Sequence, residues 1–283
     1  MLTPTTTTDT NMAVQVHRVY QQLATASSLE PSDEVNKLFS ELVRLSLVPL
    51  HTEDAARMLA DPIIDAIREN LWRVCARGEF ELERQWSTRV AEAEDAWVEL
   101  RRFPYYGNYE KLARLEAAAL MGAAGRPLER VLFVGSGPLP LTSILLARHH
   151  GMRVDNVEQD ERAFRVSRHL SERLGMAHQL HYRHADVLSC TDLGDYDCVF
   201  LAALVGMNAR EKTALLRHLG ACMRPGALLL ARSSARLRGL LYPEVDIGRL
   251  QPFLPRMEIH PHDEIVNSVL IAEVPAAPIP AAA

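Results

Sequence analysis

Apolar residues recur at every third or fourth position up to about residue 125, a spacing typical of amphipathic helices. The clearest case predicts a helix with one buried face, formed by Val35, Leu38, Phe39, Leu42 and Leu45. Ser32 is placed to cap this helix, and Asp33 and Glu34 follow where negative charge suits the positive end of the helix dipole. The segments 52–77, 79–100 and 108–122 are predicted as further helices.

After Pro127 the pattern changes to short apolar runs that alternate with helical segments. Strands are expected at 131–135, 153–157, 180–184, 197–202, 227–232 and 268–274, and helices at 141–150, 161–174 and 209–223. This alternation predicts a parallel, doubly wound α/β sheet whose ligands bind at the carboxyl ends of the strands.

The change of pattern predicts two domains between two disordered tails. Residues 13–126 are expected to form an all-helical domain, and residues 127–274 a Rossmann-like domain. The Thr-rich segment 1–12 and the Pro/Ala-rich segment 275–283 lack hydrophobic periodicity, so both are expected to be disordered.

Composition narrows the class of protein. The 283 residues carry a net charge of −5, which gives no basic footprint for nucleic acid or an anionic membrane. No apolar run approaches the roughly 18 residues of a membrane span, and the N-terminus lacks the features of a secretory signal. Four scattered cysteines, Cys75, Cys190, Cys198 and Cys222, favour reduced thiols. We therefore expect a cytoplasmic protein that acts on small molecules.

The first predicted strand runs into a glycine turn, Gly135-Ser136-Gly137-Pro138. Glycines allow the backbone to turn tightly and approach a ligand, while N–H groups of the next helix point at it. Pro140 stands where the dinucleotide fingerprint G-x-G-x-x-G has its third glycine, which argues against NAD.

Two acids follow the next two strands. Glu158 lies 21 residues after Gly137, where a carboxylate can accept hydrogen bonds from ribose hydroxyls. Asp186 lies just past the third strand and is placed to receive an adenine amino group. The glycine turn together with these two acids is typical of the S-adenosylmethionine (SAM) pocket of class I methyltransferase-like folds.

A second polar cluster lies in the helical region. Glu81 and Glu83 flank Leu82, and the segment 103–109 (FPYYGNY) places three tyrosines within five positions. From composition alone, a core-packed turn between two helices is the favoured interpretation. A carboxylate that faces a phenol in a cleft would instead form a proton-transfer pair.

At these residues the sequence resembles the nicotianamine synthase family. The matching stretches cover most of the chain outside the tails: FPYYGNYEKL (103–112), FVGSGPLPLTS (133–143), VFLAALVGM (199–207), ARSSARLRGLLYP (231–243) and HPHDEIVNSVLIAE (260–273). The tyrosine turn and the Pro-Leu-Pro glycine loop are not shared by ordinary methyltransferases.

The resemblance implies a class I SAM-dependent methyltransferase-like fold with an unusual use of SAM. Such enzymes transfer the 3-amino-3-carboxypropyl arm to an amine and release methylthioadenosine, in the biosynthesis of metallophores. Plant members join three such units, and related enzymes use histidine or glutamate as acceptor. A conventional small-molecule methyltransferase and a non-catalytic SAM sensor are the alternatives.

The resemblance also suggests a role for the polar cluster. Glu83 is the expected general base for the acceptor amine, with Tyr106 or Tyr109 as its hydrogen-bonding partner. Glu81 is the rival base if the helix register differs by two residues.

Three further residues are expected to contribute to substrate binding. Arg232, at the end of the fifth predicted strand, could hold a carboxylate through its two-pronged donor geometry. Tyr242 and Asn267 are weaker candidates for the pocket wall. The histidine pairs 181/184 and 260/262 are expected at the surface, so no metal is predicted. A homodimer is one assembly that the sequence allows.

Overall fold

The structure is a computed structural model that describes residues 7–276. The chain forms two compact units. The first holds the described residues up to Leu82 together with Ser234–Glu244, and the second holds Glu83–Ser233 and the described residues from Val245 onward. In the described part of the chain, no helix combines the length and apolar character needed to cross a membrane.

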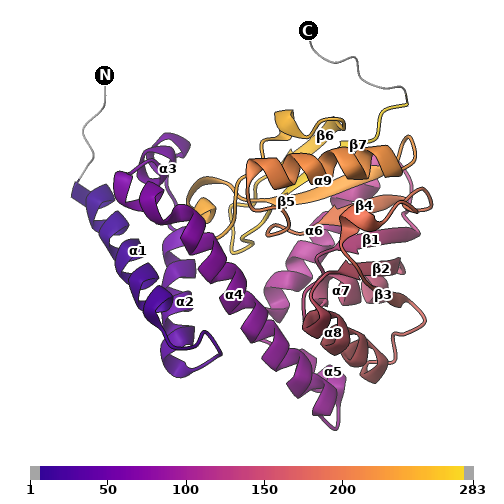
Figure 1. The fold of residues 1–283 in the computed structure, drawn as a ribbon, viewed down its shortest axis with the longest axis horizontal. Coiled ribbons are helices and arrows are strands. Elements are labelled where there is room, and N and C mark those ends of the chain that lie inside the picture. Colours follow the sequence, from indigo (N-terminus) through magenta and orange to yellow (C-terminus); the bar gives the residue numbers. More distant parts are fainter. Residues whose placement is uncertain (1–6, 277–283) are drawn as a thin grey trace. The chain divides into compact units, whose positions relative to one another are not determined.

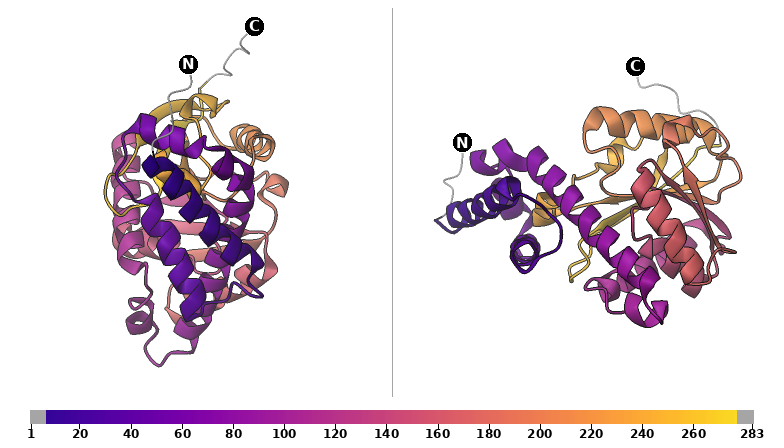
Figure 2. Two further views of the ribbon diagram at one scale, coloured as in Figure 1. Left: turned by 90° about the vertical axis from the view of Figure 1, so that its left-hand side faces the viewer. Right: turned by 60° about the horizontal axis from the view of Figure 1, so that its bottom comes forward.

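The first unit is helical, as the sequence predicted. It contains α1 (Thr7–Thr25), α2 (Asp33–Ser46), α3 (Thr52–Leu59), the first part of α4 (Pro62–Glu92) and the short η2 (Arg236–Leu240). Its first helices are drawn in indigo in Figure 2. The returning segment is anchored where Trp72 Nε1 donates a hydrogen bond of 2.9 Å to the Gly239 carbonyl. This segment therefore joins a unit from which it is distant in sequence.

Helix α2 confirms the prediction made from periodicity and capping. Ser32 is its N-cap, and its hydroxyl oxygen accepts a hydrogen bond from Val35 N at 3.2 Å. Helix α1 begins at Thr7, inside the segment 1–12 that was expected to be disordered. Residues 1–6 of that segment and 277–283 of the predicted C-terminal tail lie outside the described residues.

Three predicted helix limits were wrong, and one of them is the predicted helix 79–100, which is interrupted at residues 93–95. The chain breaks at Ala60 and Asp61, and α4 starts at Pro62, whose missing N–H suits the first helical position. Conversely, α4 runs through Gly78 without a break. A Cβ at Gly78 would lie 2.1 Å from the Phe39 ring, so this glycine gives room for packing and does not end the helix.

The second unit begins within α4 and includes α5 (Ala96–Leu100) and α6 (Tyr106–Ala124). The sequence placed these helices in the N-terminal domain, with the boundary near residue 126. Hydrogen bonds explain the difference: Trp97 Nε1 donates to the Leu174 carbonyl at 3.2 Å, and Arg173 donates to the Ala91 carbonyl at 2.7 Å. These helices therefore pack with the unit that contains the sheet.

The core of the second unit is a seven-stranded sheet in the order β3-β2-β1-β4-β5-β7-β6 (Figure 1). Its strands are β1 (Arg130–Val134), β2 (Arg153–Glu158), β3 (Leu180–His184), β4 (Cys198–Leu201), β5 (Leu228–Ser233), β6 (Leu254–Ile259) and β7 (Ser268–Glu273). The first five are parallel, as predicted, whereas β7 runs antiparallel to β5 and β6 antiparallel to β7. Strand β6 was not predicted, because its largely exposed residues and Pro255 give no apolar run.

Helices cover both faces of the sheet. Helix α9 (Ala209–Cys222) packs on one face through a core that includes Leu132, Val199 and Leu229. On the other face, Ser143 of α7 (Leu141–His150) donates a hydrogen bond of 2.7 Å to Asn156 of β2. Helix α8 (Glu161–Arg173) and the short η1 (Val187–Ser189) and η3 (Ile247–Arg249) complete the unit. The doubly wound α/β class predicted from the sequence is confirmed.

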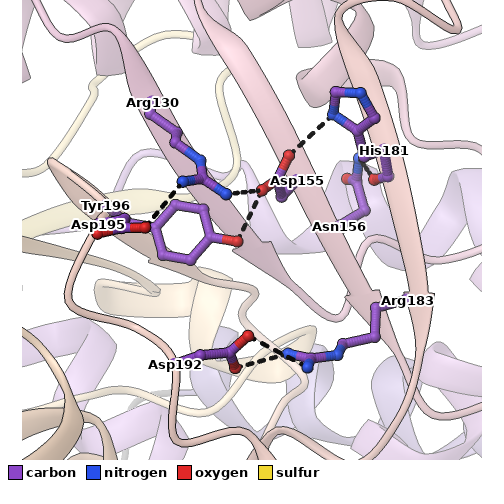
Figure 3. Close-up of polar contacts among 8 residues, drawn as sticks. All are labelled: Arg130, Asp155, Asn156, His181, Arg183, Asp192, Asp195 and Tyr196. Carbon is purple, nitrogen blue, oxygen red and sulfur yellow. Dashed lines mark hydrogen bonds and ion pairs between the residues drawn. The ribbon is translucent and has the colours of Figure 1, made fainter.

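A polar cluster joins β1, β2 and β3 away from the carboxyl ends of the strands (Figure 3). The Asp155 carboxylate accepts hydrogen bonds from Arg130 Nη2 at 2.9 Å and from the Tyr196 hydroxyl at 2.7 Å, and it lies 3.0 Å from His181 Nδ1. Burial alone would raise the pKa of Asp155, but its hydrogen bonds to Tyr196, Arg130 and His181 hold that pKa below its ordinary value.

We predict that Asp155→Asn lowers the free energy of unfolding by about 1–3 kcal/mol at neutral pH, because it leaves half-buried donors poorly paired. A depressed native pKa stabilises the fold above the unfolded-state pKa and loses that effect as pH falls through the native value. The difference between wild type and variant, measured by urea unfolding, should therefore shrink below about pH 4.

Asp195→Asn is the matched control, because Asp195 also pairs with Arg130, at 3.3 Å, but its side chain is 83% exposed against 16% for Asp155. It should change stability by less than about 0.5 kcal/mol. An equal loss in the two variants would show that Asp155 has no special role in the cluster.

Candidate active site

The glycine turn leaves the carboxyl end of β1 and leads into α7. Gly135 and Gly137 have φ values of +76° and +69°, a conformation that side chains disfavour. A Cβ at Gly135 would also lie 2.3 Å from Val205 Cγ2. The backbone path therefore favours glycine at both positions, and a side chain at Gly135 would also require Val205 to move.

Glu158 ends β2 beside this turn. Its carboxylate is buried and accepts two backbone hydrogen bonds of 2.9 Å, from Gly137 N and from Asp160 N. The acid predicted from its spacing thus reaches the glycine turn directly.

Asp186 follows β3, next to the end of β2. The backbone N–H of Ala185 donates to the Glu158 carbonyl at 3.1 Å, which sets the two strand ends side by side. The Asp186 side chain is exposed, and its Oδ1 accepts a hydrogen bond from Leu188 N at 2.9 Å. Part of this carboxylate therefore caps η1, and it also faces solvent at the edge of the site.

Ser136 and Pro138 complete the turn. Ser136 is 8% exposed, and its hydroxyl has no hydrogen-bond partner within the part of the chain that the structure describes. The Pro138 carbonyl accepts a hydrogen bond of 2.6 Å from the Ser87 hydroxyl of α4. A buried hydroxyl without a partner carries a desolvation penalty, so Ser136 is suited to a polar ligand.

Glu83 of α4 lies against the glycine turn. Its side chain is 9% exposed, and Oε1 accepts a hydrogen bond of 3.2 Å from the Tyr109 hydroxyl. A Cβ at Gly137 would lie 2.7 Å from Glu83 Oε2. The structure thus brings one acid of the helical region to the turn that the sequence marked as the cofactor site.

Tyr109 is held by an aromatic cluster. The Phe103 ring lies 6.4 Å from that of Tyr109, 5.7 Å from that of Trp86 and 5.8 Å from that of Tyr105. The tyrosine turn is therefore packed, as its composition suggested, and it also presents a phenol to a carboxylate.

The alternatives Tyr106 and Glu81 are placed differently. Tyr106 is half-buried near Glu110, and burial followed by the charge of Glu110 raises its pKa. Glu81 precedes Glu83 by two residues on a continuous helix, which turns its side chain by about 200° around the helix axis. Of the predicted phenols, Tyr109 is the one whose hydroxyl donates to Glu83.

Arg232 is committed to a buried ion pair. Its Nε and Nη2 donate to the two carboxylate oxygens of Glu116 at 2.7 and 3.0 Å, and Nη2 also contacts Thr142 Oγ1 at 2.6 Å. Both charged side chains are almost completely buried. The predicted clamp for a substrate carboxylate therefore already holds a carboxylate of the protein, and these contacts tie β5 to α6 and α7.

The other two predicted wall residues lie in different units. Tyr242 belongs to the first unit, where its hydroxyl donates to the Glu79 carboxylate at 3.3 Å. Asn267 belongs to the second unit and immediately precedes β7. Its buried Nδ2 has no hydrogen-bond partner among residues 7–276, so it retains a donor for a ligand.

Two residues of the site, Glu116 and Ser87, were not predicted from the sequence. Glu116 is a single acid within the apolar segment 112–121 of α6, a pattern that indicates a buried partner. Ser87 carries no comparable signal, because a serine within a helix is common. No group of three His, Cys, Asp or Glu side chains that could hold a metal ion occurs in the described residues.

The sheet order and the glycine turn define a chain of the class I methyltransferase-like fold. A family model described as "Nicotianamine synthase protein" matches residues 6–278. The chain belongs to the nicotianamine synthase family, which confirms the resemblance inferred from its five motifs.

Plant relatives agree with this assignment. The chain is 43% identical to nicotianamine synthase 2 of Oryza sativa subsp. japonica over 87% of this chain and 77% of that protein. Nicotianamine synthase 1 of Arabidopsis thaliana is 38% identical over 91% of this chain and 82% of that protein.

Two crystal structures share the fold. The complex of MtNAS with MTA and tNA gives a TM-score of 0.83 at 24% identity, over 95% of this chain and 98% of that one. A mutant of MtNAS in complex with S-adenosylmethionine gives 0.80 at 24% identity, over 92% and 97% of the two chains.

Proposed function

We propose that this chain is a SAM-dependent aminocarboxypropyltransferase. It transfers the 3-amino-3-carboxypropyl group of SAM to an amine acceptor and releases methylthioadenosine, in the biosynthesis of a metallophore. The observation that carries the proposal is the Glu83 carboxylate, which accepts a hydrogen bond from Tyr109 and lies against the Gly137 backbone. Membership of the nicotianamine synthase family supports it.

The residues around the glycine turn fit SAM. Glu158 is buried at the end of β2, where its carboxylate can exchange backbone contacts for ribose hydroxyls. The Ser136 hydroxyl is buried with an unused donor, which a ligand oxygen would satisfy. We assign Gly135, Gly137 and Pro138 to the wall of the SAM-binding site.

We also assign Asp186 and Asn267 to the binding site. Asp186 follows β3, and its carboxylate is placed to accept a hydrogen bond from the adenine amino group. Asn267 offers its buried Nδ2 to a substrate oxygen. Arg232, held by Glu116, contributes by fixing the end of β5.

The chemistry requires a base at the acceptor amine. The amine nitrogen, once it has lost its proton, forms a bond to the carbon next to sulfur, and the carbon–sulfur bond breaks with its electron pair passing to sulfur. The sulfonium becomes the neutral thioether of methylthioadenosine, and the proton passes to the Glu83 carboxylate. Tyr109 keeps that carboxylate oriented by donating to Oε1.

The site favours this reaction over the alternatives. The family assignment speaks against an ordinary methyltransferase, and a SAM sensor would need no buried carboxylate paired with a phenol. The acceptors expected from the resemblance, which are histidine, glutamate or a SAM-derived unit, all present an α-amine to such a base.

The first test is Glu83→Gln, which keeps the shape of the side chain but cannot accept the proton. Release of methylthioadenosine should fall by about 10²–10⁴-fold, the usual contribution of a general base. Binding of SAM, measured by calorimetry, should change less than about twofold because shape and burial are retained.

Glu81→Gln is the matched control two residues away on the same helix. It should release methylthioadenosine at more than half of the wild-type rate. Wild-type activity in Glu83→Gln together with an inactive Glu81→Gln would overturn the assignment of the base.

The second test compares Gly137→Ala with Gly151→Ala. The two glycines have nearly the same positive φ, +69° and +68°, but an added Cβ at Gly151 meets nothing within 4 Å. Both variants should therefore lose about 1–2 kcal/mol of stability through backbone strain.

Only Gly137→Ala forces Glu83 from its position, so release of methylthioadenosine should fall by about 100-fold in this variant alone. Thermal unfolding and steady-state kinetics measure the two effects separately. Equal activity in the two alanine variants would contradict a role for the contact between Glu83 and Gly137.

A further inference from the structure

Ser87 connects α4 to the glycine turn one helical turn beyond Glu83. Its side chain is completely buried, and its hydroxyl donates a hydrogen bond of 2.6 Å to the Pro138 carbonyl, 51 residues away in sequence. No step of the proposed chemistry uses this contact. Ser87 lies one helical turn from the proposed base, however, so this contact can affect where the Glu83 carboxylate lies.

The Pro-Leu-Pro segment explains why this carbonyl is available. Helix α7 begins at Leu141, and Ile144 N donates to the Pro140 carbonyl at 3.0 Å. The Pro138 carbonyl lies ahead of this helical bonding pattern, and a buried carbonyl needs a donor. The Ser87 hydroxyl supplies that donor.

The two contacts share one face of α4. Glu83 and Ser87 are four residues apart and lie above one another on a helix. Their partners, Gly137 and Pro138, are neighbours in the turn. A rotation or slide of α4 that moved Glu83 from Gly137 would also break the hydrogen bond between Ser87 and Pro138.

We infer that Ser87 is a positioning residue for the transfer reaction, because it fixes the register of α4 on the glycine turn and thereby the place of the Glu83 carboxylate. This inference rests on the proposed function. A displacement of about 1 Å at a reacting group can cost 10²-fold in rate, so one buried hydrogen bond at this point is sufficient to matter.

The test compares Ser87→Ala with Thr88→Ala in the full chain. The Thr88 hydroxyl donates to the Arg84 carbonyl at 3.0 Å within the same helix, so its removal deletes a hydroxyl without touching the turn. Ser87→Ala should lower kcat for release of methylthioadenosine by about 10–100-fold, with KM and SAM affinity within about twofold. Thr88→Ala should keep the wild-type kcat.

Two further variants separate positioning from loss of structure. Ser87→Thr keeps the hydroxyl and should recover at least about a third of the wild-type kcat, a difference of less than 1 kcal/mol in the barrier. Ser87→Cys keeps the side-chain volume with a weaker donor and should give an intermediate kcat at an unchanged melting temperature. It also preserves the test if the alanine variant fails to fold.

The outcomes also separate this inference from the proposed function. If wild type and Thr88→Ala release methylthioadenosine and Ser87→Ala or Ser87→Cys does so at the same kcat, the positioning role is overturned. A wild-type protein that releases no methylthioadenosine from SAM and any of the expected amine acceptors would instead overturn the proposed function.

Discussion

The close approach of the Glu83 carboxylate to the Gly137 backbone is the constraint on which the site depends. A Cβ at Gly137 would lie 2.7 Å from Glu83 Oε2, so any side chain there would require this carboxylate to move. The close approach also requires a donor for a largely buried carboxylate, which Tyr109 supplies. A carboxylate that touches the turn between β1 and α7 is placed at the ligand-binding end of the sheet, and the proposed proton transfer follows from that position.

Two buried polar contacts hold the helices that carry this pair. Arg232 of β5 binds Glu116 of α6, and Glu116 lies two helical turns beyond Tyr109 on the same helix. Ser87 of α4 binds the Pro138 carbonyl one helical turn beyond Glu83. Removing one partner of a buried ion pair typically costs about 3–5 kcal/mol, because the other charge is then left buried and unpaired, so Arg232 and Glu116 depend on each other. The base and its phenol are therefore each fixed to the sheet unit by a neighbour on the same helix.

The sequence predicted the elements with a regular apolar pattern and missed those without one. Strands β1, β4 and β5 were predicted because they are buried apolar runs, and α7 because Gly151 marks its end, whereas β6 is exposed and contains Pro255. At the site, Glu158 and the glycines followed from spacing, and Glu83 from the resemblance. The commitment of Arg232 to Glu116 could not be read from the sequence, because the pairing joins residues 116 positions apart. The boundary between the two compact units could not be predicted from the sequence either, because it falls inside the continuous helix α4.

The most direct test of the account follows carbon from SAM into the product. SAM labelled in its carboxyl carbon and SAM labelled in its methyl group are incubated separately with the protein and an amine acceptor, and the products are resolved by mass spectrometry. The account predicts that the carboxyl label enters the acceptor product while the methyl label remains in methylthioadenosine. A methyl label in the acceptor product, with S-adenosylhomocysteine as co-product, would contradict it.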